Sequence, residues 1–294
     1  MIGMRNKKRS KLANWLAVLL ARAWHVRYGL TVAIVYGVVF GWLFSGTEFS
    51  GNATVFEVPD KPLWSAPAAA SWFGKTGSGA DLFELSRAGM ASSVGFALVT
   101  SILGIFSALM ISTGVASLRN SLGFRLLKQI SFNWALFPAF LIAMISAGGS
   151  GGNIVCVTTA VSIVISLSLL GTIGNWLELS ESGGDVLAGL ALGMSRPALV
   201  WKRSLPVAGK KCLALIACLI PLTAAVEMAL SFLGFLGDRI SCGRMISLGR
   251  DHLFEAPWLA VYPGILATLV LIVLSVLGWF TARLVKVTSS PKIF

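Results

Sequence analysis

Charged residues are scarce in this chain. Only 12% of its 294 residues are Asp, Glu, Lys or Arg, whereas 56% are hydrophobic. Soluble globular domains carry roughly 25% charged residues. The composition therefore excludes a water-soluble globular protein, and we expect the lipid bilayer to be the solvent of the fold.

Residues that ligate metals or carry out acid-base catalysis are also few. The chain has two histidines, His25 and His252, and four cysteines without a C-x-x-C spacing. Since no pair of these residues stands at a ligand spacing, we expect no metal site and no catalytic residues. The phosphate-binding pattern G-x-x-x-x-G-K-[ST] is missing as well. A nucleotide-binding P-loop in this chain is therefore excluded.

The sequence is instead rich in long apolar runs. A helix of roughly 20 apolar residues crosses about 30 Å of hydrocarbon. The runs that approach this length lie at residues 30–46, 92–115, 130–147, 154–173, 212–236 and 259–284. We therefore predict an all-α polytopic membrane protein with about six transmembrane helices.

The basic residues predict how the chain is oriented. Its net charge of +12 comes from 24 lysines and arginines against 12 acidic residues, and most of the basic residues lie in alternate loops. Such a bias marks the cytoplasmic side of a membrane, so it needs no nucleic-acid partner. We expect a multi-pass membrane protein with both termini in the cytoplasm. The predicted regions are a basic cytoplasmic segment 1–29, a first transmembrane helix 30–46, a periplasmic loop 47–90, a core 91–285 with five transmembrane helices, and a cytoplasmic tail 286–294.

The cytoplasmic segment 176–211 is longer than a simple connection between two helices. Residues 185–192 are expected to form a short helix that Gly193 ends. Ser195 is expected to cap a second helix, which continues until Pro206 breaks the chain. The result is a helix-glycine-helix elbow, a form that suits a docking surface.

Several separated segments resemble the binding-protein-dependent ABC transporter permeases. The resemblance is to the oligopeptide, dipeptide and nickel branch, and within it to the second, C-type permease subunit. The matching segments are residues 73–81, AGLALG at 188–193 with Leu205 and Pro206, EMALSFLG at 227–234, and 249–264. They resemble, in order, the family's segment before its second helix, its EAA loop, its EAALSFLG segment, and its last outer loop with the start of the sixth helix.

The resemblance implies a type I importer fold and a transport subunit without enzymatic activity, located in the bacterial inner membrane. A second permease would share the translocation path, and two ATP-binding subunits would hold the elbow and bind ATP and Mg²⁺. A periplasmic or lipid-anchored solute-binding protein would deliver the cargo, and this chain itself would bind no cofactor. The residues implied to couple to the ATPases are Asp185, Leu187, Ala188, Gly189, Gly193, Leu205 and Pro206.

The chain departs from the family pattern inside the elbow. Leu187 stands where the family has Glu, and Gly189 stands where it has its second Ala. Three interpretations stay open: altered coupling, weak coupling, or coupling matched to a co-evolved ATPase.

Glu227 is an ionisable residue inside an apolar run, where a charge is costly. One interpretation is a structural hydrogen bond or salt bridge to a neighbouring helix. The other is that Glu227 faces the translocation path or the partner permease.

The cargo cannot be read from these residues. The family suggests a peptide or a similar small solute, and nickel is a further candidate. The alternative function is a repurposed or non-transport membrane protein, such as a channel, a scaffold or a membrane-embedded enzyme.

Overall fold

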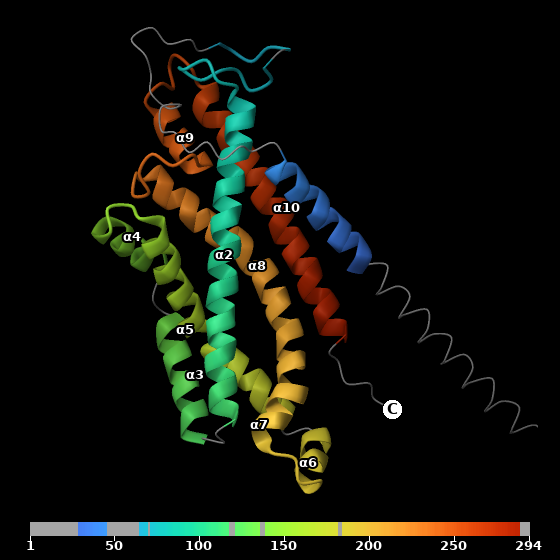
Figure 1. Cartoon of the computed structure of the whole chain (residues 1–294). Coiled ribbons are helices and arrows are strands. Elements are labelled where there is room, and N and C mark those ends of the chain that lie inside the picture. Colours follow the sequence, from blue (N-terminus) through green and yellow to red (C-terminus); the bar gives the residue numbers. More distant parts are fainter. Residues whose placement is uncertain are drawn as a thin grey trace, which may run out of the picture.

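The computed structural model describes residues 29–45, 65–69, 71–117, 121–135, 139–181 and 184–288. These residues form a bundle of helices (Figure 1). After a first helix, Gly29–Phe44, the elements are α2 (Leu82–Ser117), α3 (Ser121–Ala135), α4 (Ala139–Gly149), α5 (Ile154–Glu181), α6 (Gly184–Ala191), α7 (Arg196–Leu199), the π-helix η2 (Val200–Ser204), α8 (Leu205–Phe232), α9 (Cys242–Arg250) and α10 (Trp258–Thr288). Of the predicted regions, residues 1–28, 46–64 and 289–294 lie outside the described residues.

Four of the described helices are long and apolar enough to cross a membrane. They are α2, most of α5, the continuous helix Arg196–Phe232 that contains α7, η2 and α8, and most of α10. The helices Gly29–Phe44 and α4 are apolar but shorter. The predicted class, an all-α polytopic membrane protein, is confirmed.

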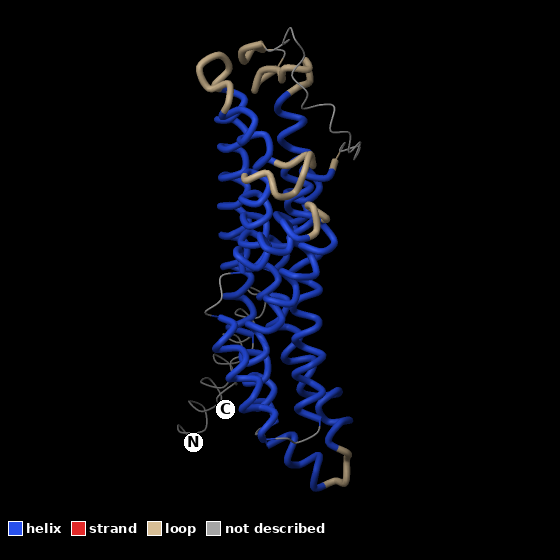
Figure 2. Tube along the Cα trace, turned by 90° about the vertical axis from the view of Figure 1, so that its left-hand side faces the viewer, coloured by secondary structure: helices blue, strands red, loops and turns tan. Residues whose placement is uncertain are grey.

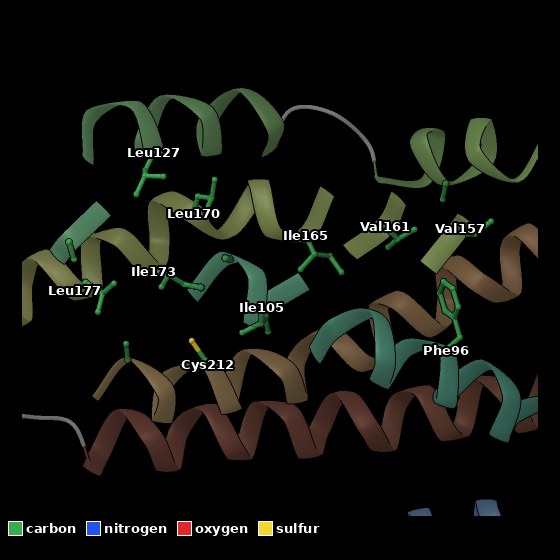
Figure 3. Packing of buried hydrophobic residues seen from close by; sticks show 14 of the residues in the cluster. Phe96, Ile105, Leu127, Val157, Val161, Ile165, Leu170, Ile173, Leu177 and Cys212 are labelled. Carbon is green, nitrogen blue, oxygen red and sulfur yellow. The ribbon is translucent and has the colours of Figure 1, made fainter. Parts of the chain in front are cut away.

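The apolar run 130–147, expected as one helix, is divided between two. α3 ends at Ala135 and α4 begins at Ala139, and the two helices follow one another along α5 (Figure 3). Residues 136–138, between the two helices, lie outside the described residues. Since α4 has 11 residues, its length of about 16 Å is too short to cross the bilayer alone.

α2 packs against α5 on one side and α8 on the other, and α10 packs against α8 (Figure 1). One buried apolar cluster joins α2, α3, α5 and α8 through residues such as Ile105, Leu127, Ile165 and Cys212 (Figure 3). A second cluster joins the helix Gly29–Phe44 to α2, α8 and α10. The helices therefore form one packed unit.

Glycines let these helices approach one another closely. A Cβ atom added to Gly278 of α10 would lie 2.7 Å from the carbonyl oxygen of Ala217 in α8. One added to Gly104 of α2 would lie 2.8 Å from the side chain of Ile165 in α5. Small residues at helix contacts are the usual means of packing in lipid, where apolar side chains gain little by leaving the solvent.

The two ends of the bundle differ. At one end, α6 and α7 form the predicted elbow, which we define as residues 184–199. At the other end lie α9 and the loop 71–81, so we call it the α9 end (Figure 1). Figure 2 shows the helices running between these two ends, with most of the loop segments gathered at the α9 end.

Candidate functional site

The elbow is closed by a glycine in the left-handed conformation. Gly193 has a φ angle of +83°. Its N–H donates to the carbonyl of Leu190 at 3.0 Å, and the N–H of Met194 donates to the carbonyl of Gly189 at 3.1 Å. These two bonds make a Schellman motif, which satisfies the last carbonyls of α6 and reverses the chain. The predicted end of the short helix at Gly193 is confirmed.

α7 follows the turn and packs back onto α6. Ser195 occupies the N-cap position, as predicted, but its side chain makes no capping hydrogen bond. Leu199 of α7 is buried, and a Cβ added to Gly189 would lie 2.6 Å from its Cδ2 atom. Glycine in place of the family's second alanine therefore gives Leu199 room against α6.

The tip of the elbow exposes apolar side chains. Leu192 is 83% exposed and Met194 is 39% exposed, on either side of Gly193. Ala188 is exposed beside them on α6. Asp185 and Leu187 lie in α6 as expected, but their side chains are outside the described part of the structure. An exposed apolar tip on a firm backbone is a surface that a partner would cover.

The prediction that Pro206 breaks the helix is wrong. The chain is helical from Arg196 to Phe232, with Pro206 near the start of α8. The reason is the π-helical turn Val200–Ser204, in which the N–H of Leu205 donates to the carbonyl of Val200, five residues earlier. This wider turn accommodates a residue that cannot donate to the carbonyl four positions back. Leu205 and Pro206 therefore belong to the helix that leaves the elbow.

Glu227 is fully buried between α2 and α8. Its Oε2 atom accepts a hydrogen bond from Ser93 of α2 at 2.5 Å, and its Oε1 atom accepts one from Ser231, one turn further along α8, at 3.1 Å. A structural role for Glu227, joining neighbouring helices, predicts hydrogen bonds of this kind. A role in the path or at the partner permease stays a prediction.

Further polar residues extend from Glu227 to the α9 end of the bundle. Arg239 donates to Ser92 of α2, the neighbour of Ser93, at 2.8 Å. Cys242, the first residue of α9, donates from its thiol to the carbonyl of Ser86 at 3.3 Å. Burial raises the pKa of the Cys242 thiol above its ordinary value. Glu227 is thus the centre of a polar cluster that joins α2, α8 and α9.

Glycines fix α9 against three long helices. A Cβ added to Gly243 would lie 1.9 Å from the carbonyl oxygen of Met228 in α8. One added to Gly249 would lie 2.5 Å from the N atom of Ala260 in α10, and one added to Gly89 of α2 would lie 2.9 Å from the N atom of Cys242. Sequence reasoning missed these contacts, although the glycines themselves were a visible signal.

A second polar contact between α2 and α8 was also missed. Ser101 and Thr223 share a hydrogen bond of 3.3 Å, and both side chains are buried. The contact lies between α2 and α8, the helices that also hold Glu227. The two contacts together hold these helices at a fixed register.

Comparison with known proteins gives a weak but long match. No family model matches the chain. Three proteins named as peptide transport system permeases, from Brucella suis, Brucella abortus and Brucella melitensis, are each 25% identical to it over 253 residues. The chain is similar to permeases.

The alignment with these permeases covers 85% of this chain and 82% of each relative. It therefore includes most of the membrane helices and is not confined to one apolar segment. Together with the four membrane-length helices, the similarity supports a multi-pass transmembrane protein with the role of an ABC permease. A transport system of this kind implies further subunits.

Proposed function

We propose that this chain is one permease subunit of an ABC importer in the bacterial inner membrane. It would be the C-type subunit of the oligopeptide, dipeptide and nickel branch, and would form half of the translocation path for peptides or a similar small solute. The similarity to the Brucella permeases supports the permease role. The names of those relatives, as peptide transport system permeases, support a peptide cargo.

The proposed orientation places the elbow and both termini in the cytoplasm. Lys202, Arg203, Lys210 and Lys211 lie in the helix that leaves the elbow, and lysine and arginine near the ends of membrane helices mark the cytoplasmic side. The α9 end then faces the periplasm, where a solute-binding protein would deliver its cargo.

The observation that carries this proposal is the continuity of the helix Arg196–Phe232. It has 37 residues, which corresponds to about 55 Å of helix. One of its ends is α7 in the elbow, and the other lies beside α9. A displacement of the elbow by an ATPase would therefore reach the periplasmic end through one hydrogen-bonded helix, as in other rigid-body transitions.

The partners follow from this arrangement. Two ATP-binding subunits would bind ATP and Mg²⁺, and one of them would cover the exposed side chains of Leu192 and Met194. A second permease would complete the translocation path. This chain would contribute the elbow and the moving helix, and it would bind neither nucleotide nor metal.

The test is co-purification of the tagged chain with its transporter subunits from mild detergent. The variant is Leu192→Glu, which places a charge on the exposed tip of the elbow. Leu122→Glu is the matched control, because Leu122 is 64% exposed at the start of α3, near the same end of the bundle. We expect Leu192→Glu to lose the ATPase and Leu122→Glu to retain it. If the wild-type chain captures no ATPase, the proposal fails.

A further inference from the structure

A cavity of about 330 Å³ lies between α5, α8 and α10. Its lining includes Trp176 of α5, Ala282 and Val285 of α10, and, on α8, Lys211, Ala214 and Cys218. Figure 1 shows α8 and α10 side by side over this part of their length. None of these residues takes part in the elbow or in the Glu227 cluster.

The cavity changes from cationic to apolar along α8. Lys211 lies at the end nearer the elbow, and Cys218 lies about 10 Å deeper in the bundle. The thiol of Cys218 donates to the carbonyl of Gly278 at 3.4 Å, which fixes this depth against α10. Between them the wall is formed by Ala214 and Leu215. A ligand that fits this wall has a charged end near the elbow and an apolar body.

The cation at the mouth has no carboxylate partner within the part of the chain that the structure describes. The Lys211 ammonium lies 5.2 Å from the centre of the Trp176 ring. The nearby carboxylate Glu178 is paired with Lys128 of α3 at 2.9 Å. On α10, Arg283 lies 4.0 Å over the ring of Trp279. Two cations and two tryptophans near one level of the bundle are typical of a membrane interface.

We propose that this cavity binds one anionic phospholipid. The lipid phosphate lies at Lys211, and one acyl chain lies along Ala214 and Cys218. A basic pocket between membrane helices is a recognised way to hold an anionic headgroup. A helix about 10 Å across would not fit a space of about 330 Å³, whereas part of a single acyl chain, which is much thinner, would. The proposal does not depend on the transport function.

The exposed thiol in the cavity provides the measurement. Cys218 is exposed, and so is Cys156 at the start of α5, whereas Cys212 and Cys242 are buried. The rate of alkylation by N-ethylmaleimide is followed at each cysteine by peptide mass spectrometry, on the full chain stripped of lipid in detergent. Three additions are then compared in separate samples. They are dioleoyl phosphatidylglycerol, dioleoyl phosphatidylcholine and glycerol phosphate. Cys156 serves as the internal control.

We expect phosphatidylglycerol to slow the alkylation of Cys218 by about fivefold more than phosphatidylcholine does. This factor corresponds to the attraction of one lysine for an anionic lipid. The rate at Cys156 should not change. Lys211→Gln should abolish the difference between the two lipids, and Lys210→Gln, one residue away and outside the cavity lining, should retain it. Protection of Cys212 and Cys242 shows that each variant is folded.

Three results would overturn the proposal. Equal protection by both lipids would mean that the site does not recognise the headgroup. Protection by glycerol phosphate alone would assign the site to a soluble phosphate compound. Loss of Cys218 reactivity in lipid-free complex with a second permease or cargo would mean that protein or cargo fills the cavity.

Discussion

The elbow and the α9 end are held in different ways. At the elbow, two backbone hydrogen bonds around Gly193 fix the turn, while Leu192 and Met194 are left exposed. At the α9 end, Gly243 and Gly249 bring α9 into backbone contact with α8 and α10, and Glu227 is fully buried beside it. The elbow turn therefore depends on backbone hydrogen bonds between neighbouring residues, whereas the α9 end depends on close contacts between helices that are distant in the sequence.

The largest effect is expected from crowding the α9 contact. In Gly243→Val, the Cβ atom alone would lie 1.9 Å from the Met228 carbonyl oxygen, so α9 would have to move. We expect a loss of about 3 kcal/mol of stability, measured by thermal unfolding of the detergent-purified chain. Gly209→Val in α8 is the control, because nothing lies within 4 Å of its Cβ position. Equal effects at both sites would remove the distinction between the two ends.

Removal of the Glu227 carboxylate should have the next largest effect. Glu227→Ala leaves the Ser231 hydroxyl without its acceptor and leaves Ser93 only the Gly89 carbonyl, at a cost of about 2 kcal/mol. Glu227→Gln keeps one acceptor oxygen and should lose about half as much. Both are measured by the same thermal unfolding.

The two variants also separate the structural role of Glu227 from a role in the path. If the carboxylate only joins α2 to α8, Glu227→Gln should transport cargo at the wild-type rate at every cargo concentration. A loss of transport at unchanged stability would instead place Glu227 at the path or at the partner permease.

The sequence predicted those features that depend on local chemistry. The short helix of the elbow, its end at Gly193 and the N-cap position of Ser195 follow from residues within one or two turns of each other. Ser231, four residues after Glu227, could have been recognised as a partner from helical spacing. Ser93 could not, because it is brought to Glu227 from 134 positions away in the sequence.

The features that sequence reasoning missed depend on packing between distant segments. Gly243 gives no sign in the sequence of the Met228 carbonyl that it contacts. The π-helical turn at Val200–Ser204 reversed the expected effect of Pro206, because the rule for proline assumes an α-helix on both sides.

A smaller and local effect is expected at Gly193. In Gly193→Ala, a side chain must adopt a φ angle of +83°, which costs about 1 kcal/mol. The Met194 amide, whose hydrogen bond closes the turn, should exchange its hydrogen about fivefold faster, while global unfolding is unchanged. Gly193→Asn is the control, because asparagine adopts this conformation more readily. A global loss of stability would show that the elbow is not a separate local unit.

The smallest effect is expected from Pro206→Ala. Alanine restores an N–H donor inside the helix Arg196–Phe232, and we expect a gain of about 0.5 to 1 kcal/mol in thermal stability. Pro197→Ala is the control, because Pro197 lies in the first turn of α7, where an N–H has no helical acceptor.

If Pro206 causes the π-helical turn, its replacement lets the chain form ordinary α-helix between Leu199 and Leu205. The elbow would then rotate relative to α8, and coupling to an ATPase would fall although the chain is more stable. The measurement is the rate of ATP hydrolysis by the assembled transporter. An unchanged rate together with higher stability would show that the π-helical turn only accommodates proline and does not set the direction of the elbow.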